Sequence, residues 1–205
     1  KWCKPDYNSV VATFCYNVSN NLSIQVHDSS SELSLVYIDD VVEEFVKIIQ
    51  RKQVNKKEIS IQPEYKIKLG DLATQIELFK ESRKSLISER VGVGFVRKLY
   101  STYISYLPPK QFSYSIPSYG DDRGMFAEIL KTKDSGQFSF FIAKQGVTRG
   151  GHYHHTKTEK FLVVQGEARF NFRHIISNET YDINTSGNKL KIIQTVPGWS
   201  HDITN

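Results

Sequence analysis

The sequence is poor in the residues that mark several classes of protein. Among its 205 residues there are two cysteines, one methionine and two tryptophans. Cys3 and Cys15 are too few and too close together for a disulfide framework, which favours a reducing, cytoplasmic compartment. No apolar run approaches the roughly 20 residues of a membrane-spanning helix, and no signal peptide is recognisable. The sequence therefore gives no indication of a membrane partner.

Charge of one sign is not concentrated in any segment. The chain has 27 basic and 22 acidic residues, which gives a net charge of +5, and the basic residues are scattered along it. No nucleic-acid-binding motif is present, so we expect no nucleic-acid partner. Scattered positive charge suits an anionic small ligand, such as a sugar nucleotide.

The first half of the chain has the pattern of a mixed helix and strand domain. Helices are predicted after the capping residues Ser9 and Asp39, through Leu72–Phe79, and through Val96–Ile104. Short strands are predicted at residues 24–27, 35–38, 59–61 and 65–67. Two consecutive prolines, Pro108 and Pro109, prevent any helix from continuing past the end of this region.

After Pro109 the pattern changes to short apolar strands separated by turn residues. Strands are predicted at Met125–Thr132, Gln137–Lys144, Glu159–Gln165, Glu167–His174 and Lys189–Thr195. Several antiparallel strands of this kind are typical of a double-sheet barrel. We therefore expect one domain over residues 1–107, a linker over 108–111, and an all-β domain over 112–205.

Histidine and glutamate are arranged within Gly146–Gly166 as ligands of a metal ion would be. His152 and His154 are two residues apart, so they face the same side if they lie in a strand. Glu159 opens the next apolar run, and His201 follows the Pro197-Gly198 turn. Two or three imidazoles and a carboxylate suit a borderline divalent ion such as zinc. The alternative is a histidine-rich turn on an exposed hairpin.

The spacing of this stretch favours the metal site over an exposed hairpin. From Gly146 through His152, His154 and Glu159 to Gly166, every position matches the first motif of the cupin family. The second stretch, Pro197 to Asn205, resembles the second cupin motif, although proline and glycine are adjacent here where the family usually has a residue between them.

Five stretches together resemble one wider family. They are KWCKPDYNSVVATFCYN, LVYIDDVVEEF, RKLYSTYISYLP, DDRGMFAEILKT and GGHYHHTKTEKFLVVQGEARF. They are similar to bifunctional capsular polysaccharide enzymes that help to make UDP-N-acetyl-L-fucosamine. These enzymes join an extended short-chain dehydrogenase/reductase (SDR) domain to a C-terminal cupin. The resemblance implies an α/β, substrate-side portion of the reductase over residues 1–107, followed by a cupin barrel over 112–205.

The resemblance also implies what the chain does and what it lacks. In the family the cupin inverts C3 of a UDP-linked 4-keto sugar, and the reductase then reduces the C4 ketone with NADPH. The family's glycine-rich nucleotide-binding loop is absent from this sequence and is expected to precede it. The chain starts at Lys1 without a methionine and stops at Asn205, just after the second motif, so we expect a fragment truncated at both ends. Pairing through the cupin predicts a homodimer.

Further residues inherit roles from the resemblance, each with a simpler alternative. Arg123 and Glu128 match positions that hold the nucleotide-sugar in related epimerases, and the alternative for Arg123 is a surface ion pair. Tyr153, His155 and Lys157 are candidate acids or bases for the epimerisation, or solvent-facing residues of a loop. Two other functions stay open, a non-catalytic cupin that binds metal and sugar and another metal-dependent cupin enzyme. The sequence also leaves open whether the metal is catalytic or structural.

Overall fold

The chain folds into two compact units. The computed structural model describes residues 2–50 and 59–205. The first unit contains the residues up to Ile116 together with Glu128–Phe138, and the second contains Pro117–Ala127 and Ser139–Asn205. The domain predicted over residues 1–107 includes residues 1 and 51–58, which lie outside the described residues. Its assignment as part of a reductase remains a prediction.

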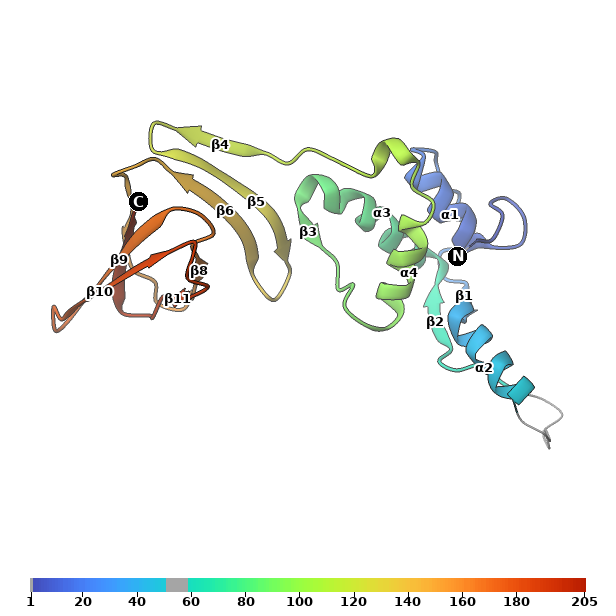
Figure 1. Cartoon of the computed structure of the whole chain (residues 1–205). Coiled ribbons are helices and arrows are strands. Elements are labelled where there is room, and N and C mark those ends of the chain that lie inside the picture. The colour runs from blue at the N-terminus through green and yellow to red at the C-terminus, as the bar shows by residue number, and fades with distance from the viewer. Residues whose placement is uncertain (1, 51–58) are drawn as a thin grey trace. The chain divides into compact units, whose positions relative to one another are not determined.

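Helices form most of the first unit (Figure 1). They are α1 (Val10–Ser19), α2 (Ile38–Gln50), α3 (Leu69–Ser85), α4 (Gly94–Ile104) and the 3₁₀ turn η1 (Pro109–Gln111). This unit also contains the hairpin of β1 (Glu32–Leu35) and β2 (Tyr65–Lys68) and the short β3 (Ile87–Ser88). The core lies among α1, α3 and α4, where Cys15, Leu72, Ile76, Phe79 and Tyr103 are almost fully buried.

The four predicted helices are confirmed, and Ser9 caps α1 as expected, but Asp39 lies inside the first turn of α2 and does not precede it as a cap. The backbone N–H of Ala12 donates to Oγ of Ser9 at 3.2 Å, which satisfies one of the free donors at the start of α1. Three of the four strands predicted in this half are wrong. Residues 24–27 and 59–61 form no strand, and β1 ends at Leu35, where a strand was predicted to begin. Ile24 and Val26 instead pack on the core from irregular chain.

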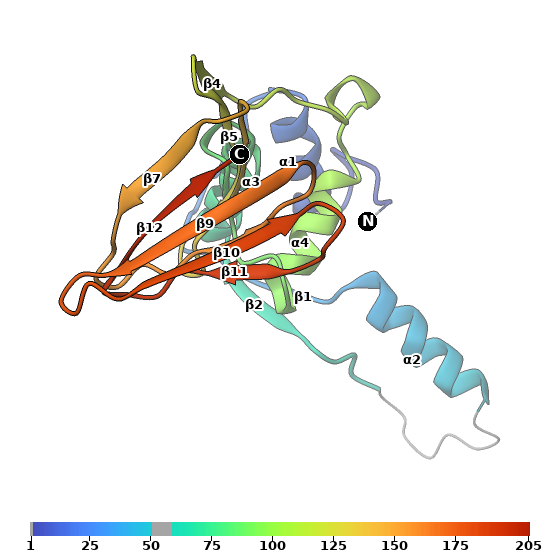
Figure 2. The ribbon, with the colours of Figure 1, turned by 60° about the vertical axis from the view of Figure 1, so that its left-hand side comes forward.

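The second unit is built from antiparallel strands. The strands that follow η1 are β4 (Ser118–Asp121), β5 (Gly124–Thr132), β6 (Gln137–Ala143), β7 (Thr148–His152), β8 (Lys160–Leu162), β9 (Glu167–His174), β10 (Thr180–Ser186), β11 (Ile192–Gln194) and β12 (Trp199–Thr204). Its main sheet has the order β10-β9-β12-β7, and these strands run side by side in Figure 2. β8 pairs with β11 in a separate ladder. Phe170, Phe172, Ile193 and Ile203 form the core of this unit.

The all-β character predicted after Pro109 is confirmed, but the closed barrel is not. Among residues 117–205, the strands form open ladders, and the main sheet ends at β10 on one side and β7 on the other. The physical reason is the pairing itself, because β8 and β11 hydrogen-bond only to each other among the described strands. Within residues 2–50 and 59–205, no helix has both the length and the apolarity needed to cross a membrane.

Candidate metal centre

His152 and His201 lie opposite each other on neighbouring strands. His152 is the last residue of β7, and the strand ladder pairs it with His201 of β12 across a register shift. His154 lies beyond the end of β7, in the loop that leads to β8. The prediction that His152 and His154 alternate along one strand is therefore wrong. Their rings nevertheless lie near each other, with centroids 4.9 Å apart, because the chain turns after His152.

Glu159 reaches the same place from the loop that precedes β8. Its backbone N–H donates to Oγ1 of Thr195 at 2.8 Å, and the N–H of Thr195 donates to its carbonyl oxygen at 2.9 Å. Thr195 is buried and follows β11, the partner of β8. These two hydrogen bonds fix the backbone of Glu159 relative to the β8–β11 ladder. Glu159 adjoins β8, which pairs with β11 and is not a neighbour of β7.

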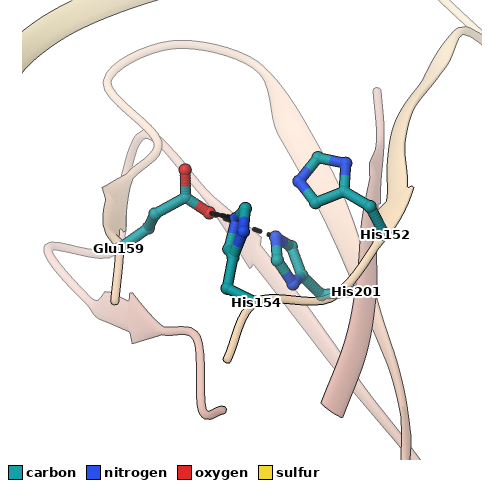
Figure 3. Close-up of side chains that lie close together, drawn as sticks. All are labelled: His152, His154, Glu159 and His201. Atoms are coloured by element: carbon teal, nitrogen blue, oxygen red, sulfur yellow. Dashed lines mark ion pairs between the residues drawn. The ribbon is translucent and has the colours of Figure 1, made fainter. Parts of the chain in front are cut away.

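The four predicted ligands converge (Figure 3). One potential ligand atom from each of His152, His154, Glu159 and His201 lies within 4.8 Å of all the others. Oε2 of Glu159 is 3.3 Å from Nε2 of His154 and 3.2 Å from Nε2 of His201. Two ligands of a tetrahedral zinc ion with bonds of about 2.0–2.1 Å are about 3.3–3.4 Å apart. The separations of Glu159 from His154 and from His201 therefore fit a tetrahedral ion.

Two of these atoms are buried without a hydrogen-bond partner. They are Nε2 of His154 and Oε2 of Glu159. A polar atom that loses water without gaining a partner costs about 1–3 kcal/mol, so such atoms are rare in folded proteins. A cation that accepts electron pairs from both atoms removes this cost. The donor set of three imidazoles and one carboxylate is the kind that zinc prefers.

The charges around the cluster favour the protonation states that a metal requires. Burial raises the pKa of Glu159, but the hydrogen bond from Lys157 and the nearby positive charges outweigh it and lower the pKa below its ordinary value of 4.5. Burial lowers the pKa of His201 below 6.5, and this effect exceeds the opposing attraction of Glu159. The carboxylate is therefore ionised and the His201 imidazole neutral at pH 7, which are the forms that bind metal.

The three residues predicted as acids or bases, Tyr153, His155 and Lys157, do not belong to the four-residue cluster. Lys157 contacts Glu159, with Nζ 2.7 Å from Oε1. The ring of Tyr153 stands edge-on to that of His155, with centroids 5.2 Å apart, and both side chains are exposed. Lys157 thus forms an ion pair with a predicted ligand.

The two residues predicted to hold the substrate each have an ion-pair partner of their own. Arg123 lies in the β4–β5 turn and binds Asp121, with Nη2 2.6 Å from Oδ2. Glu128, in β5, binds Lys131 at 2.7 Å. Neither belongs to the four-residue cluster, and their role in binding a substrate remains a prediction.

Sequence reasoning missed the residues that support the ligands. Thr195 was predicted only as the end of a strand, yet it holds the backbone of Glu159. The rings of Phe161 and Phe172 lie 6.4 and 6.3 Å from that of His201 and bury it. The alternation of Phe170 and Phe172 in β9 was the available signal, since it marks the inner face of the sheet that His201 shares.

The chain is similar to a polysaccharide biosynthesis domain and to a UDP-sugar reductase. Residues 119–205 match the family model of the polysaccharide biosynthesis C-terminal domain. The whole chain is 57% identical to a UDP-2-acetamido-2,6-beta-L-arabino-hexul-4-ose reductase of Pseudomonas aeruginosa and spans 55% of that protein. The chain thus covers about half the length of this curated relative.

Solved structures give the same result. The chain is similar to the capsular polysaccharide assembling protein CapF from Staphylococcus aureus, with a TM-score of 0.93 and 43% identity over all of this chain and 56% of that one. It is equally similar to CapF crystallised with the inhibitor 3-isopropenyl-tropolone, with a TM-score of 0.93 and 43% identity over 60% of that chain.

Proposed function

We propose that the chain contributes to an enzyme that modifies a UDP-linked sugar for capsule synthesis, because it is similar to a UDP-sugar reductase and to the capsular polysaccharide assembling protein CapF. The name of the Pseudomonas aeruginosa relative describes a reductase of a UDP-linked 4-keto sugar, which supports this substrate class. In this proposal the first unit is the substrate-side part of an NADPH-dependent SDR reductase, and the glycine-rich loop for NADPH lies outside this chain. The second unit is a cupin, and the protein acts in the cytoplasm.

The observation that carries the proposal is the four-residue cluster. His152, His154, Glu159 and His201 would hold a divalent ion, with zinc the best fit to three nitrogens and one oxygen. When bound, such an ion supplies a Lewis acid that polarises a carbonyl oxygen. The chain's own contribution is to bring these four side chains together and to keep Glu159 ionised and His201 neutral.

The reaction proposed for this unit is inversion of C3 beside a C4 ketone. The ketone makes the C3–H acidic, so one group of the protein removes that proton and another returns it from the opposite face of the ring. Tyr153 and His155 are exposed, adjoin His152 and His154 in the chain, and are the proposed proton carriers. Arg123 and Glu128 are proposed to bind the nucleotide-sugar after leaving their present partners, Asp121 and Lys131.

The experiment measures metal content and hydrogen exchange on the same preparation. The 205-residue chain is incubated in D₂O with the UDP-linked 4-keto sugar. We expect it to introduce deuterium at C3 of the sugar, which mass spectrometry and NMR would detect. His152→Ala removes one ligand and is expected to reduce both the bound metal and the exchange. His174→Ala is the matched control, because His174 is paired with Ser177 and lies outside the cluster. Full exchange by His152→Ala without metal would refute a role of the ion in epimerisation.

A second function is favoured by one feature of the cluster. Four protein ligands fill a tetrahedral zinc site, and closed sites of this kind are usually structural, whereas catalytic sites keep a position open. The alternative is therefore a non-catalytic module that binds metal and sugar. Such a module would bind zinc and lose it in His152→Ala, yet would leave C3 unlabelled in D₂O.

We also propose that the protein pairs through this unit as a homodimer, which light scattering would test.

A further inference from the structure

The two carboxylate oxygens of Glu159 have different surroundings. Oε2 is buried and faces the Nε2 atoms of His154 and His201 at 3.3 and 3.2 Å. Oε1 points away from them and lies 2.7 Å from Nζ of Lys157. One oxygen is therefore directed into the histidine cluster, and the other is held by an ammonium group at its edge.

The backbone of Glu159 is fixed independently of this contact. Thr195, of which 3% is exposed, both accepts from the Glu159 N–H and donates to the Glu159 carbonyl oxygen. The side chain of Glu159 can still rotate, and this rotation decides whether one or both carboxylate oxygens face the cluster. This orientation is the choice that remains. Lys157 is the residue whose contact restricts this choice.

We propose that Lys157 is a positioning residue that makes Glu159 a single-oxygen ligand in the metal site. This inference rests on the proposed function, because it requires that His152, His154, Glu159 and His201 bind a metal. A carboxylate binds an ion through one oxygen or through both, and the two modes give different coordination numbers. The hydrogen bond from Lys157 occupies Oε1, so Oε2 alone faces the ion. Lys157 thus acts on a ligand and not on the sugar, in contrast to the acid–base role that its place in the motif suggests.

The effect of Lys157 is on coordination and not on folding. Its side chain is 62% exposed, and exposed ion pairs contribute little to the stability of a fold. Partners that hydrogen-bond to metal ligands have larger effects on the metal, since their loss typically weakens metal binding by about 10–100-fold. A variant of Lys157 should therefore fold normally and bind metal differently.

Cobalt(II) tests this inference, because it replaces zinc and its visible spectrum reports the coordination number. Lys157→Met frees Oε1, so the cobalt spectrum should lose the intense bands of a four-coordinate ion, and zinc should bind about 10-fold or more weakly in competition with a chelator dye. Lys157→Arg keeps a donor for Oε1 and should show the cobalt spectrum and the zinc affinity of the unaltered chain. Lys160→Met is the control, since Lys160 is exposed, adjoins Glu159 and has no ion pair among the residues that the structure describes.

Each outcome decides the question. If Lys157→Met and Lys160→Met change the spectrum and the zinc affinity equally, the effect is one of net charge and the positioning role is wrong. If the unaltered chain gives no cobalt spectrum beyond that of the free ion, the metal site itself is absent, and both this inference and the metal-dependent function fail. Thermal unfolding without metal should be the same in all four proteins, and a large loss in Lys157→Met would show a structural role instead.

Discussion

Replacement of Glu159 by glutamine tests the metal centre with the smallest change of shape. Glu159→Gln keeps the size of the side chain and removes its negative charge, so the carboxylate ligand and the ion pair with Lys157 are lost together. Loss of a ligand should weaken zinc binding by at least as much as loss of a partner that supports a ligand, which is about 10–100-fold. We take about 100-fold as the working value.

The expected change in stability follows from this value. At a free zinc concentration about 1,000 times its dissociation constant, bound zinc stabilises the folded chain by about 4.1 kcal/mol. Binding that is about 100-fold weaker leaves the same zinc concentration at about 10 times the dissociation constant, where the stabilisation is about 1.4 kcal/mol. The difference of about 2.7 kcal/mol corresponds, for a chain of this size, to a thermal unfolding midpoint about 5–10 °C lower in Glu159→Gln than in the unaltered chain.

The assay is scanning calorimetry with zinc and with a chelator. Without zinc, the unaltered chain and Glu159→Gln should unfold within a few degrees of each other. The ion pair that the variant loses contributes at most about 1 kcal/mol, because its other member, Lys157, is largely exposed. With zinc, the unfolding temperature of the unaltered chain should rise in full, and that of Glu159→Gln should rise much less. Glu167→Gln is the control, since Glu167 is exposed at the start of β9 and lies outside the cluster. An equal rise in Glu159→Gln and in the control would refute Glu159 as a ligand.

Three further predictions concern the fold. Gly124→Ala should lower the free energy of unfolding, measured by urea titration, by about 1–3 kcal/mol. A Cβ atom at this position would lie 1.9 Å from the Ile142 carbonyl oxygen, and the φ of Gly124 is +140°. Gly92→Ala is the control and should leave the free energy of unfolding unchanged, because the space around Gly92 is open. In the native chain iodoacetamide should label Cys3, which is exposed, and spare Cys15, whose thiol pKa is raised to about 12 by burial; mass spectrometry should then find the second label only after unfolding. Hydrogen bonds from Ser30 and Ser31 lower the pKa of Asp28 to about 2 from 3.8, so its stabilising effect is present above pH 3.8 and is lost as the pH falls towards 2. The difference in urea midpoint between the unaltered chain and Asp28→Asn should shrink over that range, and a constant difference would contradict this account.

The helices of the first unit could be predicted because local signals and burial agree there. Ser9 caps α1, and Leu72, Ile76 and Phe79 repeat with helical spacing on the buried face of α3. The segment at residues 24–27 has the apolar pattern of a strand but no partner strand in the described structure. Pairing is a property of the whole fold, so a short apolar run alone cannot show whether a second strand lies beside it.

The strands that carry the metal ligands were the hardest to predict. β12 has the sequence WSHDIT, whose inward residues His201 and Ile203 alternate with polar ones, and a histidine on the inner face conceals the apolar alternation. β7 contains Gly150 and Gly151, which usually indicate a turn. Gly150 is required by close approach, since a Cβ atom there would lie 2.8 Å from the His201 carbonyl oxygen. The ligand residue types were therefore evident from the sequence, but the strands that hold them were not.

The register of β7 against β12 explains how His152 comes to face His201. Regular antiparallel pairing runs from Thr148 opposite Thr204 to Gly150 opposite Asp202, and would next place Gly151 opposite His201. The ladder instead shifts there and pairs His201 with His152, which makes Gly151, at φ +78°, the extra residue of a bulge. If the regular pairing continued instead, His152 would lie opposite Ser200 and point to the opposite face of the sheet from His201, because side chains alternate along a strand. A single glycine that interrupts the alternation thus places the first histidine of the motif beside the last, and no spacing rule within one strand could have predicted that contact.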